Sequence, residues 1–513
     1  MTRIRCRLIY IILLIFLFIP YTFGDDLLSL SLEDCILKTL DSNLSIVVER
    51  YNPQLAVATL SQAREVFLPQ FDLSYGMQNT EEPPYWWIQG QGTQETEYSN
   101  YSVEFSQLIP TGGSFSFSLS SYKSDTNQSF QLINPRYGST LRLDFTQPLL
   151  KNFGYRISRK DILLARNNVD ISQNQLQSVV LEKIYQVQEA YWNLVYAIED
   201  HKVKQQSLQL GRDLLSKNQK EVEVGKLAPI EILNAETVVA TREAEILQAE
   251  ALIRSQEDAL KAIMNISGED LFKRITTLDE PQFFKRDVSL EAALQEAFLR
   301  RPDLKISEIN SQSKNLELSV ARNQLLPSLD LTFSYWSPGI SGDRILYQDN
   351  NPFLGIIIGT EEGGARGSIQ DALNLLYKNW FIGLTLSLPV SNLISRANFT
   401  RAQIEMNKSL VELENARQIV QLEVRDIIRS IETNAKRVKA YRLARKLAEQ
   451  RLEAEVKKLK VGLTTNYFVL EFQEQLANAK SQEIRALIDY NLSLAALEKV
   501  TGNSLEKMNI EIK

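Results

Sequence analysis

Histidine and cysteine are almost absent from this sequence. His201 is the single histidine among 513 residues, and Cys6 and Cys35 are the two cysteines. Zinc sites and Cys/His nucleophile pairs bring several such side chains together, and this inventory supplies neither. His201 lies between charged residues of a predicted helix, so we expect its ring to be solvated. We predict that the protein is not an enzyme and uses no catalytic metal or cofactor.

Long apolar runs are also missing, except at the N-terminus. Three arginines precede an unbroken apolar run over residues 8–19, Pro20 ends it, and small residues follow before Asp25. A helix over this run would be about 18 Å long, against a bilayer core of about 30 Å. We therefore predict a cleaved signal peptide over residues 1–24 in preference to an uncleaved membrane anchor.

The mature chain would be acidic and would hold one thiol. The net charge is −6 before the basic signal peptide is removed, which argues against a nucleic-acid surface. Cys35 alone cannot form an internal disulfide, and we expect it to be a small buried residue. Beyond the signal no apolar run reaches the length of a spanning helix, but alternating strands can still face lipid.

The sequence contains an internal duplication. Residues 31–33 recur as 289–291, and residues 63–75 are matched by residues 321–333 at the same offset. Three further pairs follow in the same order: Gln147-Pro148-Leu149 with Leu388-Pro389-Val390, Val224-Gly225 with Val461-Gly462, and Ser267-Gly268 with Thr501-Gly502. Such order predicts two homologous halves, residues 25–280 and 281–513.

In each half a helical segment, over residues 31–67 or 289–326, is followed by two-residue alternation. This alternation predicts strands with one apolar and one polar face, in a membrane or in an ordinary soluble sheet. The first half offers four candidates and the second half two: about 70–78, 99–108, 113–122 and 139–147, then 329–335 and 384–388.

Two very long stretches lack helix breakers. Residues 157–223 and 396–460 contain no proline, and Gly211 is their single glycine. The first would extend roughly 100 Å as a helix. Apolar residues recur at spacings of three and four, which is typical of helices packed side by side as coiled coils.

Each long helix is predicted to turn back at a glycine. Gly225 and Gly462 follow the two stretches, and a glycine just past a helix end is the expected stop signal. Helical periodicity resumes over about 229–264 and 466–500. The fold class we predict is therefore mainly α, with long antiparallel helical hairpins and additional strands.

These features resemble the TolC-like outer-membrane efflux proteins over essentially all of the mature sequence. The motifs that carry the resemblance are Leu326–Leu331, Trp380–Pro389, Val461–Thr464 and Thr501-Gly502, in this order. The resemblance implies a homotrimer in the outer membrane that extends into the periplasm. Strands of three protomers would close one β-barrel in outer-membrane lipid, and the coiled-coil helices would form a periplasmic α-barrel.

The function implied by the resemblance is a passive exit duct in a tripartite efflux or type I secretion system. Its partners would be a periplasmic adaptor (membrane-fusion) protein and an inner-membrane pump. Two alternatives remain at this point. One is a different function, that of a soluble periplasmic coiled-coil scaffold or adaptor. The other concerns the cargo of the duct, which belongs either to drug or metal efflux or to protein secretion.

Some implied details depart from the family pattern of two strands per half. We expect the additional strand pair of the first half to lie outside the barrel, in preference to a barrel with more strands. We also expect residues 337–368 to form a surface loop, and the 31–67 and 289–326 helices to stack on the returning helices.

The resemblance places functional contacts at the two glycine turns. The candidate adaptor contacts are Val224, Gly225, Leu227, Val461, Gly462, Leu463 and Thr464. Glu231 and Glu471, shortly after the turns, are candidates for the periplasmic entrance, where six carboxylates would attract cations. The alternative for either residue is a solvated helix face. Phe468 occupies the position equivalent to Glu231 and no arginine follows Gly462 nearby, so we do not expect a charged latch.

Overall fold

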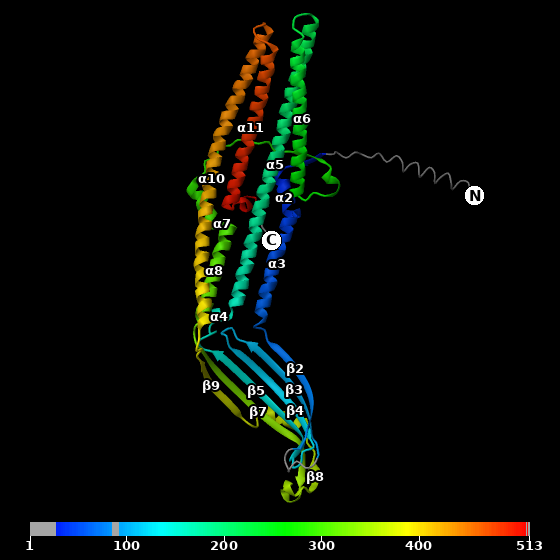
Figure 1. The fold of residues 1–513 in the computed structure, drawn as a ribbon, viewed down its shortest axis with the longest axis vertical. Helices are drawn as coiled ribbons and strands as arrows, with labels where there is room; N and C mark the ends of the chain where they lie inside the picture. Colours follow the sequence, from blue (N-terminus) through cyan, green and yellow to red (C-terminus); the bar gives the residue numbers. More distant parts are fainter. Residues whose placement is uncertain (1–26, 85–91, 509, 511–513) are drawn as a thin grey trace, which may run out of the picture. The chain divides into compact units, whose positions relative to one another are not determined.

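The fold is described from a computed structural model that covers residues 27–84, 92–508 and 510 (Figure 1). The predicted signal peptide lies outside these residues. The chain divides into two compact units, one mainly helical and one built around a sheet. The helical unit takes the N-terminal part to Asn52, then Gln173–Lys305 and the chain from Asn415, and the sheet unit takes Pro53–Ser172 and Ile306–Glu414.

The first two helices of each half have the same lengths and the same spacing. They are α2 (Leu32–Ser42) and α3 (Leu44–Glu65), then α7 (Leu290–Arg300) and α8 (Pro302–Asn323). In both halves an 11-residue helix precedes a 22-residue helix. Ser31 and Ser289 cap the shorter helices, and each hydroxyl accepts a hydrogen bond from the amide three residues later. The internal duplication is confirmed at the level of elements.

Four long helices form two hairpins, in which α5 pairs with α6 and α10 with α11 (Figure 1). Their bounds are α5 Lys160–Glu223, α6 Ile230–Ile263, α10 Leu393–Lys460 and α11 Asn466–Thr501. Helix α4 (Tyr155–Ser158) precedes α5, whose 64 residues correspond to about 96 Å. The predicted hairpins are confirmed. None of the helices in the described ranges is both long enough and apolar enough to cross a bilayer.

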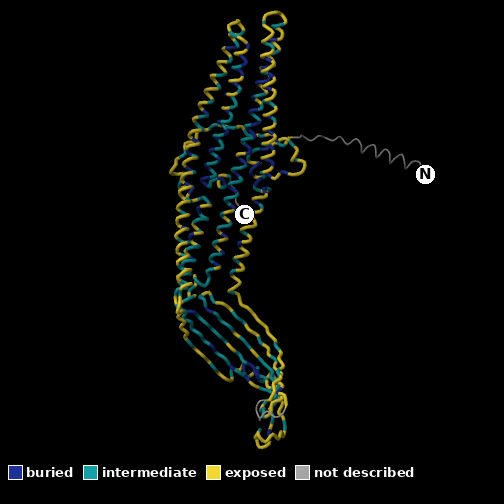
Figure 2. The backbone as a smooth tube through the Cα atoms, viewed as in Figure 1, coloured by how far each residue is buried: buried dark blue, intermediate teal, exposed yellow. Residues whose placement is uncertain are grey.

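The apolar periodicity of these helices becomes a narrow buried stripe. Val187, Tyr191 and Leu194 on α5 are completely buried, as are Val424 and Val438 on α10. Figure 2 shows buried residues along the packed sides of the helices and exposed residues over the hairpin ends. Because most of each helix surface stays polar, stability depends on lateral packing along the whole length.

The shorter helices stack on the ends of the returning helices, as predicted. The Asn43 side-chain nitrogen donates to the Ile263 carbonyl at the end of α6 (2.7 Å), and its oxygen accepts the amide of Ser45 at the start of α3 (3.0 Å). In the second half Arg300, at the end of α7, donates to the Asn503 side chain just beyond α11. One polar side chain thus satisfies two helix ends at once.

A small parallel pair of strands closes the helical unit. Strand β1 (Leu27–Leu30) pairs with β6 (Arg274–Thr277). The Asp279 carboxylate then accepts the amide of Leu32 and the hydroxyl of Tyr191, both at 2.7 Å. Cys35 beside them is 0% exposed, as predicted, and burial raises the pKa of its thiol to about 12.

The sheet unit holds one antiparallel sheet of seven strands in the order β2-β3-β4-β5-β7-β8, with β9 also paired to β7. The strands are β2 Gln70–Glu82, β3 Gln94–Leu108, β4 Ser114–Thr126, β5 Ile133–Pro148, β7 Ser328–Tyr347, β8 Ile357–Glu361 and β9 Asn379–Ser387. Short helices complete the described part of the chain. In the sheet unit they are α9 Ala365–Leu373 and the 3₁₀ turns η4 Gln348–Asn350 and η5 Pro352–Leu354, and in the helical unit they are α12 Ser504–Lys507 and the 3₁₀ turn η3 Gly268–Leu271.

One expectation about this unit is wrong, and the place of the additional strand pair relative to the barrel stays a prediction. That pair does not form a separate hairpin, because β4 is paired with β3 along its whole length and all four strands of the first half share one sheet with β7 and β9. Residues 337–368 are not a surface loop, since β7 continues to Tyr347 and α9 packs on the sheet. The glycines there permit close packing: a Cβ at Gly339 would lie 2.1 Å from the Ser368 carbonyl oxygen.

Candidate functional site

The two hairpin ends have the same backbone geometry. Gly225 and Gly462 have φ values of +75° and +73°, which favour glycine. In each turn the glycine amide donates to the carbonyl three residues back, at 2.9 and 3.1 Å. The next amide donates to the carbonyl five residues back, at 2.7 and 3.0 Å. Both turns are thus Schellman motifs, which end the long helices in a defined shape.

The predicted contact residues at these turns are mostly exposed and apolar. Val461 is 69% exposed and Leu463 is 77% exposed, and Val224 at the other turn is comparable. Leu227 and Thr464 are half-buried. The Thr464 hydroxyl donates to the Glu455 carboxylate at 2.5 Å, which holds the pKa of that carboxyl below its usual range.

The structure adds apolar residues that sequence reasoning missed. Tyr467 and Phe468 are exposed at the start of α11, with ring centroids 5.6 Å apart, and Ile230 and Leu233 are exposed at the start of α6. Their signal in the sequence was an apolar residue directly after a glycine turn, where a solvated helix would carry polar residues. With Leu463 and the two valines they give each hairpin end an apolar surface, which we call the tip surface.

The two predicted entrance carboxylates differ in environment. Glu231, in the first turn of α6, is half-buried, and one of its carboxylate oxygens is buried without a hydrogen-bond partner in the described chain. Its backbone carbonyl accepts the side-chain amide of Asn218 at 3.3 Å. Glu471 on α11 is half-buried too and accepts a hydrogen bond from Gln475 at 3.0 Å. Neither residue lies on a fully solvated helix face.

A buried arginine joins the two hairpins a few helical turns away from the tip surface. Arg242 on α6 is 5% exposed. Its guanidinium donates to the Ser207 carbonyl on α5 (2.7 Å) and to the Leu470 carbonyl on α11 (3.2 Å). A Cβ at Gly211 would lie 2.9 Å from the same guanidinium, which explains the single glycine in the long helices. Burial lowers the pKa of Arg242 from its ordinary value.

An apolar cluster between this arginine and the hairpin tips extends the contact between the hairpins. Leu214 on α5, Ala235 on α6, and Val469 and Leu470 on α11 are buried together, with side chains of α10 packed against them. The four helices therefore form one packed bundle at this level, and the tip surfaces belong to the same body.

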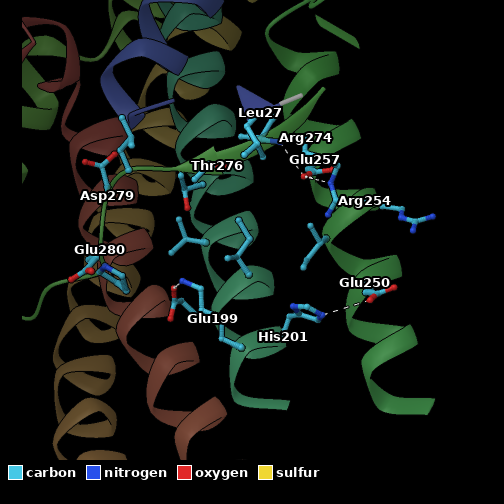
Figure 3. A pocket seen from close by; sticks show the side chains of 18 residues that line it. Leu27, Glu199, His201, Glu250, Arg254, Glu257, Arg274, Thr276, Asp279 and Glu280 are labelled. Atoms are coloured by element: carbon cyan, nitrogen blue, oxygen red, sulfur yellow. Dashed lines mark hydrogen bonds and ion pairs between the residues drawn. The ribbon is translucent and has the colours of Figure 1, made fainter. Parts of the chain in front are cut away.

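A cavity of about 630 Å³ lies among α5, α6 and the strand β6 (Figure 3). His201 lines it with 17% of its side chain exposed and lies 3.8 Å from Glu250, so its ring is only partly solvated. Glu257 is buried in the wall and accepts hydrogen bonds from Arg274 and from the amide of Ile275, both at 3.1 Å. Because these charges are paired with one another, the cavity wall has the character of a structural ion-pair network.

The described part of the chain contains no cluster of three or more His, Cys, Asp or Glu residues placed to hold a metal ion.

Comparison with known protein families identifies the family of this chain. The outer membrane efflux protein family matches residues 99–266 and 293–503, which is more than half of the sequence. The chain belongs to this family.

Individual relatives of this efflux protein are distant. Outer membrane protein TolC of Escherichia coli K12 is 24% identical over 321 residues, which cover 62% of this chain and 61% of TolC. The alkaline protease secretion protein AprF of Pseudomonas aeruginosa is 23% identical over 377 residues, which cover 73% of this chain and 71% of AprF. The crystal structure of the Campylobacter jejuni CmeC outer membrane channel superimposes with a TM-score of 0.66 at 16% identity, over 94% of this chain and 90% of CmeC.

Family membership confirms several predictions. The protein is an outer-membrane efflux channel of the TolC family that extends into the periplasm, and it is not an enzyme. The fold, with long helices and antiparallel strands in a two-part repeat, is the fold of these channels. The two matched segments fall one in each half, while the boundaries of the halves stay a prediction.

Proposed function

We propose that this efflux protein is the exit duct of a tripartite efflux or type I secretion assembly. Three copies would close one β-barrel with their sheet units and one periplasmic tunnel with their helical hairpins. The tip surfaces would bind a periplasmic adaptor, which connects the duct to an inner-membrane pump. The contribution of this chain is a passive path, because no energy-coupling site is expected in it.

The observation that carries this proposal is the tip surface. Solvent-exposed groups of large apolar side chains mark binding surfaces in proteins. Here Leu463, Val461 and Tyr467 are exposed around a turn that a Schellman motif holds in one shape. A preformed apolar surface loses little conformational freedom on binding, which favours docking of a partner.

The same proposal assigns the entrance of the duct. Glu231 and Glu471 lie near the start of the two returning helices, and three copies would bring six carboxylates to one end of the tunnel. A ring of carboxylates attracts cations and repels anions. The unpaired buried oxygen of Glu231 supports this assignment, because a buried carboxylate oxygen without a partner is costly and calls for a functional reason.

The identity of the cargo depends on the partner pump in this proposal. AprF is named for secretion of a protease, and CmeC for an outer membrane channel. Because the proposed duct is passive, the adaptor that binds the tips would define the transport class.

The proposal is tested by photo-crosslinking in cells. A photoreactive amino acid replaces Leu463, and a matched control replaces Leu447, which is also exposed but lies about 20 Å up the same hairpin. Mass spectrometry then identifies the captured proteins. Capture of a periplasmic adaptor from position 463 and not from 447 supports docking at the tips.

Other outcomes contradict parts of the proposal. Capture of further copies of this chain alone at position 463 would mean that the tips meet one another but do not dock an adaptor. If nothing is captured and detergent-free washing releases the protein from membranes, the exit-duct function itself is wrong.

A further inference from the structure

We infer that each protomer contributes six long strands to the membrane wall, so that three copies close a wall of about 18 strands. The six strands are β2, β3, β4, β5, β7 and β9. The family pattern of two strands per half would give four per protomer. This inference rests on the proposed trimeric duct and specifies its membrane part.

An apolar row crosses all six strands without interruption. Its members are direct cross-strand partners: Phe71, Phe105, Phe117, Leu143, Tyr335 and Trp380. The next row toward the other end of the sheet is Leu73, Val103, Leu119 and Leu141, and it ends at Ser337 on β7. Strands that are additional to the family pattern therefore carry the same apolar band as the others.

The opposite face of the same six strands is mostly polar, although Trp336 and Phe381 also lie on it. The row adjacent to the aromatic row consists of Asp72, Glu104, Ser118, Arg142, Trp336 and Asn379. The Ser74 and Ser102 hydroxyls in the following row are 2.7 Å apart. A membrane barrel needs this division, with an apolar outer face for lipid and a polar inner face for water. A strand pair that lay outside the wall would not need to continue both faces in register.

The connection between β3 and β4 is fixed to the rest of the unit. Within this turn the amide of Ile109 donates to the Gly113 carbonyl at 2.7 Å. The Thr111 hydroxyl donates to the Gln147 side chain at the end of β5 (2.7 Å), and the amide of Gly154 donates to the Thr111 carbonyl (3.0 Å). The β2–β3 pair thus cannot swing away from the sheet without breaking these bonds.

The free edges of the sheet show what completes it. In the described sheet β2 pairs with β3 alone and β9 with β7 alone, so each has one edge without a partner strand. Lipid cannot satisfy the backbone groups of such an edge. Both edge strands carry exposed apolar residues of the band, including Phe71 and Leu73 on β2 and Trp380 and Leu384 on β9.

A second copy of this chain fits these edges. Neighbouring strands alternate in direction through all six, since every pairing among them is antiparallel. The β9 edge of one copy is therefore antiparallel to the β2 edge of the next, and the ladder continues around the ring. With strands about 4.8 Å apart, six strands per protomer make the wall roughly 1.5 times wider in circumference than four.

Disulfide crosslinking of the assembled protein in outer membranes tests this wall. In a Cys35→Ser background, Ser74→Cys on β2 is combined in turn with Asn379→Cys, Thr385→Cys or Ser387→Cys on β9. These side chains lie on the polar face, and three β9 positions sample the register between copies. The six-strand wall predicts that at least one pair yields covalent dimers and trimers, about tenfold above either single cysteine variant.

A matched set distinguishes the four-strand wall. Ser118→Cys on β4 replaces Ser74→Cys, with the same three β9 positions. If β4 forms the edge of the wall, this set crosslinks between copies and the β2 set does not. That result overturns the six-strand wall but leaves the proposed exit duct intact.

An internal control keeps the experiment informative. Ser102→Cys and Ser120→Cys are direct partners on β3 and β4, and they should crosslink within one chain if the sheet has formed. If this control forms while neither the β2 set nor the β4 set links copies, the wall between copies is wrong. Adaptor capture at Leu463 then decides separately whether docking at the tips survives.

Discussion

Single residues determine how the two hairpins of the helical unit are held together. The contact of greatest consequence is Arg242, a buried charge that donates to carbonyls of two other helices. In the sequence it is one of many arginines in a polar helix, and periodicity alone cannot mark it as buried. Gly211 was visible as an exception, but its reason becomes clear only when the guanidinium opposite it is seen.

Arg242→Met should destabilise the helical unit by about 2–3 kcal/mol, because it leaves buried carbonyl groups without their charged donor. Thermal unfolding of the detergent-solubilised protein measures this effect. Arg212→Met is the matched control, since Arg212 also joins α5 to α6, through Glu243, but is exposed. We expect the control to change stability by less than about 1 kcal/mol. Equal effects of the two variants would contradict the role of Arg242.

The effect of Gly211→Ala on the stability of the protein should change sign when Arg242 is replaced by methionine. In the natural background the new Cβ would lie 2.9 Å from the guanidinium and would displace it, which destabilises the protein. In the Arg242→Met background that clash is gone, and alanine favours the helix over glycine by about 1 kcal/mol. A double-mutant cycle by thermal unfolding measures the coupling, and simple additivity would exclude the contact.

The turn between α10 and α11 should become less stable at acidic pH. The hydrogen bond from Thr464 lowers the pKa of Glu455 in the folded protein. Its stabilising effect is therefore complete above the unfolded pKa of about 4.3 and is lost as pH falls through the lower folded value. Amide hydrogen exchange at residues 461–466 between pH 3 and 6 should show this loss. Thr464→Val should weaken the pH dependence in this range, since only the bond to Lys458 and the charge of Arg451 then lower this pKa, and an unchanged pH dependence would point to another group.

At the scale of elements, the helices end where the sequence indicates and the turns have the expected geometry. The glycine turns, the capping serines and the helix lengths are local properties, so short segments suffice to predict them. Alternation also predicts the strands, but it ends β7 too early. Glycines such as Gly339 and Gly342 are typical of loops, whereas here they allow α9 and strand β5 to approach β7 closely.

Leu463, exposed at the tip of the α10–α11 hairpin, is expected to contact the adaptor. Leu463→Asp should reduce adaptor binding and efflux at least tenfold, because it places a charge in the apolar tip surface, while the amount of protein in the membrane stays unchanged. Leu447→Asp, on the same hairpin and also exposed, serves as control. Drug or protein export in cells and adaptor co-purification measure the effect. Normal export with Leu463→Asp would remove this residue from the docking surface.

At the scale of the whole molecule, the two faces of the sheet set what each substitution does. Leu73→Lys places a charge in the apolar band of β2, which costs about 2–4 kcal/mol in the middle of a bilayer. Ser74→Lys, one residue further, points to the polar face and should be tolerated. The yield of folded, membrane-inserted protein measures both. If the two variants assemble equally well, the assignment of the faces is wrong.

Much of this protein is determined by local sequence: the duplication, the two long hairpins, the glycine turns and the alternating strands. These follow from periodicity, capping and backbone preferences, which act over a few residues. Only the tertiary structure decided that six strands form one sheet, that His201 lines a cavity and that Arg242 joins the hairpins. The physical reason is that strand partners and buried polar contacts join residues far apart in the sequence, such as Arg242 and Gln473 at a separation of 231 positions, and local patterns do not specify which distant partner is chosen.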